Sequence, residues 1–330
     1  MGRETYRAAG VDIDLVKEAI GALTGRVSFR REGPYGMLGG MGHYAGLIEF
    51  GEHVLALTTD GVGTKMLVAD HEKDWRTVGI DCIAMNANDL FVMNVEPVAF
   101  VDYIATDLLS VEKMAQIGEG LNEGARQANL NLVGGETAQL PGLVNGLDLA
   151  GTCLGVQERE KVVTGEKIKP GDCIVGVPSS GIHSNGLSLA RRVVEKSGGY
   201  NKRLPDGMTL GKALLTPTRI YHESLEACRR TEVHGMCHVT GSGLLNFTRI
   251  THYGFEFTDP LPVHPVFPYI QEKGQIDPVE MYRTFNMGMG FAYVLPEDGA
   301  GVIQKLIPGS RVVGRIVKEA GIRVKGLSIR

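Results

Sequence analysis

The 330-residue sequence lacks a long apolar run, a CxxC pair and a strong excess of charge of either sign. No stretch approaches about 18 apolar residues, so no transmembrane helix is predicted, and residues 1–6 lack the apolar core of a signal peptide. The net charge is −4 with dispersed lysine and arginine, which argues against binding to nucleic acid or an anionic membrane. The five cysteines are odd in number and irregularly spaced, so we expect a reduced, cytoplasmic protein.

The sequence does contain enough apolar residues for more than one core, and glycine is abundant. Hydrophobic residues make up 43% of the chain, and 45 residues are glycine. Strand-like and helix-like patterns follow one another in both halves, and the polar stretch 167–172 interrupts them. We therefore predict an α/β fold of the α+β type with two α/β domains, residues 1–166 and 167–330.

The most informative segment is Asp-Gly-Val-Gly-Thr-Lys at residues 60–65, directly after the apolar run 54–57. Glycines let the backbone N–H groups approach a phosphate closely, and the lysine adds a mobile positive charge. The glycine spacing differs from the GxxxxGK[ST] phosphate loop, so the segment alone is a weak signal. We assign nucleotide contacts to Gly61, Gly63, Thr64 and Lys65, a metal ligand to Asp60, and catalysis to both Asp60 and Lys65.

Polar residues interrupt an apolar helix predicted over 77–94, and a Gly-Gly-Glu-Thr motif follows the strand 130–133. A buried carboxylate must be paired or bound to a cation, and Mg²⁺ prefers one or two carboxylates together with phosphate and water oxygens. Alternatively, these groups cap or hydrogen-bond neighbouring turns, and for Asp81 the sequence does not decide between the two readings. We predict Mg²⁺ ligands at Asp60, Asp89 and Glu136, and nucleotide contacts at Asn88, Glu136 and Thr137.

A loop rich in serine and glycine, residues 179–186, lies between a predicted strand and a predicted helix. Such a loop can direct N–H groups and hydroxyls at an anion, although it also fits an ordinary connection with an N-cap at Ser184 or Asn185. We assign substrate contacts to Ser180, Gly181, His183, Ser184 and Asn185, with His183 also a catalytic candidate. His234, Cys237 and His238 do not form a predicted zinc site, because no second Cys/His pair completes it.

With these motifs in order, the chain resembles the phosphoribosylformylglycinamidine cyclo-ligase family, the aminoimidazole ribonucleotide synthetases, from residue 5 to the end. The family's triple glycine after His-x-Thr is here Gly241-Ser242-Gly243, and its Gly-Lys after residue 106 is Asp107-Leu108. The glycine loop 39–43 is also extended before Leu47. The resemblance rests on residues 6–14 (YRAAGVDID), 59–65 (TDGVGTK), 79–81 (GID) with 88–90 (NDL), 134–137 (GGET), 180–186 (SGIHSNG), 215–221 (LTPTRIY), 238–241 (HVTG) and 281–286 (MYRTFN).

The resemblance implies an enzyme that uses ATP and Mg²⁺ to close the ring of formylglycinamidine ribonucleotide in purine biosynthesis, releasing ADP and phosphate. It implies a homodimer in which the N-terminal sheets of the two subunits pair, with ATP bound near the interface between the subunits. Selenophosphate synthetase is disfavoured because it needs a reactive cysteine or selenocysteine near its N-terminus, whereas the first cysteine here is Cys82. The hydrogenase maturation dehydratase needs a C-terminal cysteine, and formylglycinamidine synthetase has a histidine-rich segment where this chain has residues 60–65, so both are also disfavoured. A thiamine-phosphate kinase and a non-catalytic ATP-binding scaffold remain as alternatives. Further substrate contacts are expected at Thr240, Gly241, Arg283, Thr284 and Asn286.

Overall fold

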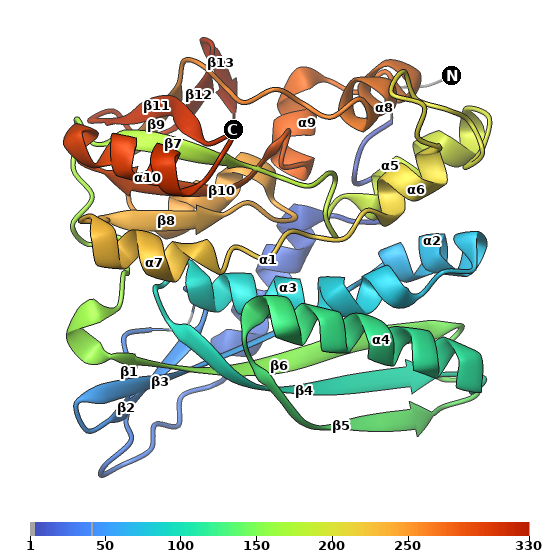
Figure 1. Cartoon of the computed structure of the whole chain (residues 1–330), viewed down its shortest axis with the longest axis horizontal. Helices are drawn as coiled ribbons and strands as arrows, with labels where there is room; N and C mark the ends of the chain where they lie inside the picture. Colours follow the sequence, from blue (N-terminus) through green and yellow to red (C-terminus); the bar gives the residue numbers. More distant parts are fainter. Residues whose placement is uncertain (1–3, 41, 330) are drawn as a thin grey trace.

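The computed structural model describes residues 4–40 and 42–329, and it contains two mixed sheets with helices (Figure 1). The first sheet has six strands in the order β1-β2-β3-β6-β4-β5, antiparallel throughout except for the parallel pair β4–β5. Its strands are β1 (Met37–Leu38), β2 (Gly46–Phe50), β3 (His53–Gly61), β4 (Glu96–Thr106), β5 (Asn131–Gln139) and β6 (Leu147–Glu158). Helices α2 (Lys65–Glu72), α3 (Arg76–Phe91) and α4 (Val111–Ala128) lie on the face toward the second half.

The second sheet has seven strands in the order β13-β12-β9-β11-β7-β10-β8. Its strands are β7 (Cys173–Pro178), β8 (Gly235–His238), β9 (Gly254–Phe257), β10 (Met289–Leu295), β11 (Arg311–Val317), β12 (Ile322–Val324) and β13 (Leu327–Ile329). The helices around it are α5 (Leu187–Lys196), α6 (Leu210–Leu215), α7 (Glu223–Arg230), α8 (Val266–Gly274), α9 (Pro278–Thr284) and α10 (Ala300–Leu306), with 3-10 turns η1 (Arg159–Lys161), η2 (Gly243–Arg249) and η3 (Glu297–Gly299). Two sheets with helices confirm the predicted fold class. The predicted domain boundary lies in the connection between β6 and β7 and stays a prediction.

Glycines allow α3 and α4 to approach each other closely. A Cβ atom on Gly120 would lie 1.8 Å from the carbonyl oxygen of Arg76, and one on Gly79 would lie 2.4 Å from the backbone nitrogen of Leu121. Because backbone sits against backbone, neither glycine can be replaced without moving a helix. This contact fixes α3, the helix that carries Asp81, Asn88 and Asp89, against the rest of its domain.

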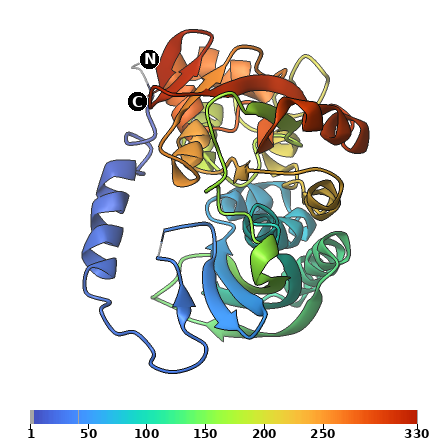
Figure 2. The same ribbon diagram turned by 90° about the vertical axis from the view of Figure 1, so that its left-hand side faces the viewer.

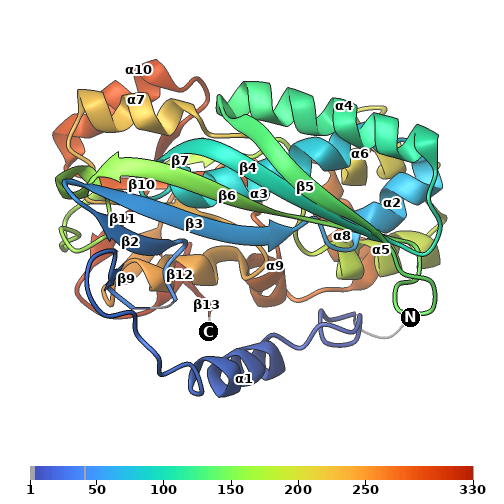
Figure 3. The ribbon, with the colours of Figure 1, turned by 90° about the horizontal axis from the view of Figure 1, so that it is seen from below.

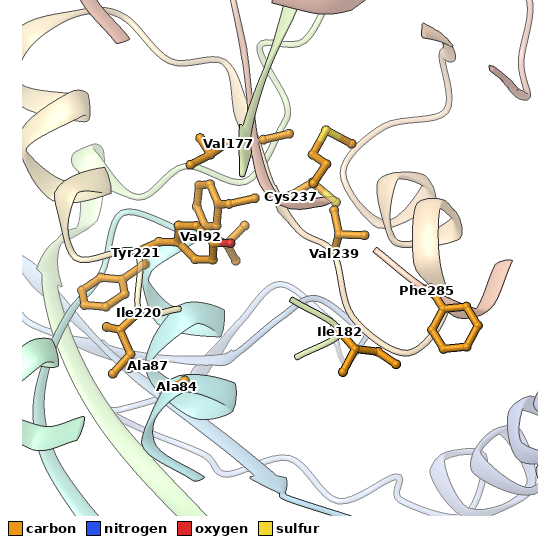
Figure 4. Packing of buried hydrophobic residues seen from close by; sticks show 14 of the residues in the cluster. Ala84, Ala87, Val92, Val177, Ile182, Ile220, Tyr221, Cys237, Val239 and Phe285 are labelled. Atoms are coloured by element: carbon orange, nitrogen blue, oxygen red, sulfur yellow. The ribbon is translucent and has the colours of Figure 1, made fainter. Parts of the chain in front are cut away.

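The two halves share one continuous hydrophobic core. Buried residues of α3, including Ala84 and Ala87, belong to the same cluster as Ile220 and Tyr221 of the second half (Figure 4). Helix α3 is apolar on most sides because it packs against the first sheet on one side and the second half on the other (Figure 1). The polar side chains of α3 therefore face the junction between the halves.

On the other face of the first sheet, no helix of the described residues covers the strands, as the view from below shows (Figure 3). Strand β3 alternates, with Val54, Ala56 and Thr58 buried and Leu57 exposed. Strand β6 pairs with both β3 and β4, and this register places Val101 and Tyr103 of β4 on the same side of the sheet as Leu57, where both are exposed. This exposed apolar face, defined by Leu57, Val101 and Tyr103, is hereafter called the outer face.

Helix α1 (Ile13–Thr24) stands apart from both sheets (Figure 2) and buries none of its side chains. Its beginning is capped by Asp12, whose carboxylate accepts from the N–H groups of Asp14 and Leu15. The preceding segment is tied to the second half, because Glu4 forms ion pairs with Arg192 and Lys196. Across the described residues, every helix is too short or too polar to cross a membrane.

Candidate active site at the domain junction

The glycine-rich segment 60–65 follows a strand, as predicted, and it leads into α2, a helix that the sequence analysis did not predict. Gly63 has φ of 67°, a left-handed conformation that favours glycine. The hydroxyl of Thr64 lies 3.2 Å from the hydroxyl of Ser188, which follows the loop 179–186 of the second half. The structure thus brings the two loops that the sequence singled out to one junction.

Asp60 and Asp89 form an electrostatically coupled pair of carboxylates at this junction. Burial and then the charge of Asp89 raise the pKa of Asp60 to about 6, although Asp60 accepts a 2.7 Å hydrogen bond from the N–H of Gly61. The amide of Asn86, one turn before Asp89 on α3, donates to the carbonyl of Asp60 at 3.1 Å. Two carboxylates whose charges repel each other in this way suit a divalent cation, which would relieve the repulsion.

A histidine of the second half holds Asp89. Nδ1 of His238, at the end of β8, donates to Oδ1 of Asp89 at 2.8 Å, and the imidazole is fully buried. Asp89 keeps 15% of its side-chain surface exposed, so its other oxygen can face a ligand. The donor set that fits Mg²⁺ is therefore Asp60 and Asp89, with His238 orienting the second carboxylate. No group of three or more acidic, histidine or cysteine side chains within residues 4–40 and 42–329 is arranged to hold a metal.

Glu136 does not join this pair within one chain, which contradicts the prediction. The register from β3 across β6 and β4 to β5 places Asp60 level with Gly135, about 14 Å away at ~4.8 Å per strand. Glu136 pairs with Tyr103 and therefore points to the outer face, whereas Asp60 follows the buried alternation of β3. Thr137 shares the exposed edge strand, so its predicted nucleotide contact is not brought to the junction either.

Lys65 is fully buried, which contradicts the prediction that its ammonium projects toward a nucleotide. Its Nζ lies 2.9 and 2.7 Å from the two oxygens of Asp81 and donates to the carbonyl of Thr216 at 2.6 Å. Asp81 also accepts from the N–H and hydroxyl of Thr218, at 2.7 and 2.6 Å. Burial lowers the pKa of Lys65, and Asp81 opposes that shift. This buried ion pair joins the two halves.

Asn88 also joins the two halves, and its predicted contact with a nucleotide is not what the structure shows. Its amide donates to the carbonyl of Arg219 at 2.9 Å, and its Oδ1 accepts from the N–H of Tyr221 at 2.9 Å. With Lys65 and Asp81, it fixes residues 216–221 against α3. Of the polar residues of α3, Asp81 and Asn88 therefore bind the second half of the chain, whereas Asp89 is accessible to a ligand.

His183 lies inside the second half, and its predicted exposure to a ligand is wrong. The ring is fully buried, and Nε2 accepts the N–H of Ser180 at 3.2 Å. Burial lowers the pKa of His183 far below its ordinary value, so the ring is neutral. It stabilises its own loop, in which Gly181 and Gly186 both have positive φ.

The other polar residues of the loop 179–186 have two roles: the serines stabilise a neighbouring segment, and Asn185 lies at the junction between the halves. The hydroxyls of Ser180 and Ser184 bond to residues 217 and 218, which secures the segment that carries Thr218. Asn185 is half-buried, reaches toward Met85 of α3, and lies 3.1 Å from where a Cβ of Gly241 would be. Asn185 and Gly241 are thus close together at the junction. Thr240 is half-buried beside them and donates to Asn246.

The segment 281–286 is only partly available to a substrate. The amide of Asn286 donates to the carbonyl of Gly181, and its oxygen accepts the N–H of Gly288, so its predicted substrate contact is replaced by a structural one. Thr284 is fully buried, and its hydroxyl has no hydrogen-bond partner among the described residues. Arg283 remains half-exposed.

Sequence reasoning missed several residues of the junction. His43 bonds to the carbonyl of Thr164, and the hydroxyl of Tyr44 lies 3.2 Å from the sulfur of Cys237. The guanidinium of Arg249 lies 5.2 Å from the centre of the Tyr44 ring. The extended glycine loop could have drawn attention to the first two, but nothing in the sequence brings Arg249 near them.

A cavity of about 1080 Å³ lies elsewhere, around the connection 157–167, and contains no predicted site residue.

The raised pKa of Asp60 predicts a pH dependence of stability. The folded-state pKa of about 6 exceeds the ordinary value of 3.8, so ionised Asp60 destabilises the fold above pH 6. Without metal, Asp60→Asn should therefore melt at a higher temperature than the unmodified protein at pH 8, and the difference should shrink at pH 5. Mg²⁺ should raise the melting temperature of the unmodified protein more at pH 8 than at pH 5. Asp14→Asn at the exposed beginning of α1 is the control; equal gaps at both pH values would contradict the assignment.

Comparisons with known proteins agree with this architecture. The AIR synthase related protein N-terminal domain matches residues 42–157, and the C-terminal domain of that family matches residues 169–326. The chain therefore belongs to the AIR synthase-related family, with both of its domains. Within it, the chain is similar to the phosphoribosylformylglycinamidine cyclo-ligases: it is 51% identical to that of Methanococcoides burtonii over 98% of each chain. It is 46% identical to that of Pyrococcus horikoshii over 98% of this chain and 99% of the other.

Solved structures with the same fold are more distant. A thiamine monophosphate kinase from Aquifex aeolicus has a TM-score of 0.64 at 16% identity, covering 96% of this chain and 98% of the other. The hydrogenase maturation protein HypE in complex with ATP has a TM-score of 0.56 at 16% identity, covering 79% and 76%. At these identities, the likeness concerns the fold alone.

Proposed function

We propose that this chain catalyses the ATP-dependent ring closure of formylglycinamidine ribonucleotide to 5-aminoimidazole ribonucleotide, with release of ADP and phosphate. The observation that carries the proposal is identity of about half the residues, over nearly the full length, to proteins of that name. The junction supports it, because loops from both domains meet beside Asp60 and Asp89. The proposed setting is cytoplasmic purine biosynthesis.

The reaction needs a phosphoryl transfer followed by a cyclisation. The formamide oxygen of the substrate attacks the γ-phosphorus of ATP, and ADP leaves with the electrons of the broken P–O bond. The amidine nitrogen then attacks the activated carbon, and after loss of a proton the phosphate leaves with the electrons of the C–O bond. Phosphoryl transfer depends mainly on positioning and on neutralising charge.

The residues of this chain suit those two requirements. Asp60 and Asp89 would hold Mg²⁺, which neutralises phosphate charge when bound. The N–H groups of Gly61 and Val62 are taken by Asp60 and by the carbonyl of Leu149, so the N–H groups of residues 63 and 64, where the chain enters α2, would approach the anion. His238 keeps Asp89 in place, and Asn185, Thr240 and Gly241 offer polar groups to the substrate on the opposite side of the junction.

The decisive assay supplies the purified protein with formylglycinamidine ribonucleotide, ATP and Mg²⁺. We expect ADP, phosphate and aminoimidazole ribonucleotide in equal amounts, with no ADP when the ribonucleotide is omitted. Thiamine monophosphate replaces the ribonucleotide in a parallel reaction and should release no ADP. ADP release with thiamine monophosphate alone would favour the kinase alternative, and ATP binding without turnover would favour the scaffold alternative.

We also propose a homodimer formed through the outer face. Leu57, Val101 and Tyr103 expose apolar surface on a sheet without covering helices, and β5 is an open edge strand. A second copy would cover both with two-fold symmetry, and a stable interface of this kind buries upward of about 2,000 Å². Glu136 would then lie within the interface.

Tyr103→Asp should convert the dimer to a monomer in sedimentation at micromolar concentration, because a buried unpaired charge opposes association. Val111→Asp is the matched control, since Val111 is a still more exposed apolar residue but lies at the beginning of α4. A monomeric unmodified protein that turns over substrate would refute the dimer.

A further inference from the structure

Arg249 is an exposed cation with a fixed position. It ends the 3-10 turn η2, which is anchored by the buried residues Asn246 and Phe247. The amide of Asn246 donates to the carbonyl of Gly243 at 2.8 Å, and its oxygen accepts from the hydroxyl of Thr240 at 3.2 Å. The backbone of Arg249 is therefore held relative to the loop 240–243.

The side chain of Arg249 rests on an aromatic platform from the other half. Its guanidinium lies 5.2 Å from the centre of the Tyr44 ring, within the range of a cation–π contact. Tyr44 is itself buried, and its hydroxyl donates to the carbonyl of His238 at 3.3 Å and lies 3.2 Å from the sulfur of Cys237. The ring thus cannot move away from beneath the guanidinium without breaking these contacts.

Among the described residues, the guanidinium forms no ion pair with a carboxylate, although its charge acts on Asp60. Burial and Asp89 raise the pKa of Asp60, and Arg249 is among the positive groups that oppose this rise. Arg249 and Asp89 also act in opposite directions on the pKa of His43, which burial lowers. Within residues 4–40 and 42–329, the ring of Tyr44 is the one partner that Arg249 has. Its N–H donors are therefore available to a ligand, and Tyr44 places them near Asp89, because the hydroxyl of Tyr44 bonds to His238 and His238 bonds to Asp89.

We propose that Arg249 binds the oxygens of the terminal phosphoryl group of the nucleotide, opposite the two carboxylates, with Tyr44 as its positioning residue. This inference rests on the proposed function for the identity of the nucleotide. A planar guanidinium with several donors matches phosphate oxygens better than an ammonium does. A cation aimed at a transferring phosphoryl group stabilises the charge that develops there.

Calorimetry with ADP and with a non-hydrolysable ATP analogue tests the proposal without requiring turnover. Arg249→Ala should weaken binding of the analogue about 10-fold or more and that of ADP much less, because only the analogue has the terminal phosphate. Arg249→Lys should restore part of the loss. The control is Arg323→Ala, which removes an exposed arginine of β12 paired with Glu319 and should change neither affinity.

Turnover provides a second readout. Arg249→Ala should lower kcat about 10²-fold, and Tyr44→Leu should produce part of that loss while Tyr44→Phe, which keeps the ring, loses less. Equal affinities of Arg249→Ala and the unmodified protein for the analogue, including no measurable binding by either, would overturn the proposal. A protein that loses analogue binding with Arg249→Ala yet forms no aminoimidazole ribonucleotide would keep this inference and refute the proposed function.

Discussion

Asp89→Asn is expected to lower kcat by about 10²-fold or more while leaving the fold intact. Asparagine keeps an oxygen that can accept the hydrogen bond from Nδ1 of His238 at the same position. It removes the negative charge that, with Asp60, attracts the cation, and transition-state charge stabilisation of this kind is commonly worth that factor. Circular dichroism should confirm the fold, and steady-state kinetics at saturating Mg²⁺ should measure the loss.

The same substitution should also lower the pKa of Asp60. The charge of Asp89 is the second cause, after burial, of the raised pKa of Asp60. Removing that charge should lower the pKa of Asp60 toward its ordinary value, which NMR of the side-chain carboxyl carbon can follow. Asp14→Asn again serves as control, because Asp14 is exposed on α1, away from both the junction and the outer face. Near-normal turnover by Asp89→Asn at saturating Mg²⁺ would eliminate Asp89 as a metal ligand.

Local sequence predicted the parts of this molecule that depend on local rules. The strand before residue 60, the buried helix over 77–94 and the loop before α5 all follow from periodicity and glycine placement, and the structure confirms each of them. The sequence singled out the segments 60–65 and 179–186 separately and did not predict the contact between Thr64 and Ser188. Their shared junction depends on how the halves pack, which a linear pattern does not encode.

The errors arose where topology or side-chain direction decides. Glu136 follows a predicted strand and a glycine pair, as a ligand-binding residue would. In the sheet, however, β6 lies between β3 and β4, and β5 is the edge strand, so Glu136 lies far from Asp60. Lys65 follows a glycine turn as a phosphate-binding lysine would, yet its stem enters the core toward Asp81. His183 lies in a polar loop but has φ of 63° and turns its ring inward. Arg249 was missed because its neighbour Tyr44 is about 200 residues away in sequence.

Lys65→Met is expected to destabilise the protein by about 3–5 kcal/mol, because it leaves the fully buried Asp81 without its cation. Two hydrogen bonds from Thr218 would remain on the carboxylate, and the carbonyl of Thr216 would lose its donor. The free energy of unfolding in urea, followed by circular dichroism, measures the loss. The junction should open early in that transition, since the lost contacts join the two halves.

Removing both charges separates a structural role of Lys65 from a direct role at the nucleotide. The double variant Lys65→Met with Asp81→Asn leaves no buried charge and should recover more than half of the lost stability, which a double-mutant cycle expresses as a coupling energy. If the pair is structural, the double variant should also recover most of its affinity for ATP. A Lys65→Met protein as stable as the unmodified one, but with a lowered kcat, would instead return Lys65 to the phosphate-binding role that its place after Gly63 and Thr64 first indicated.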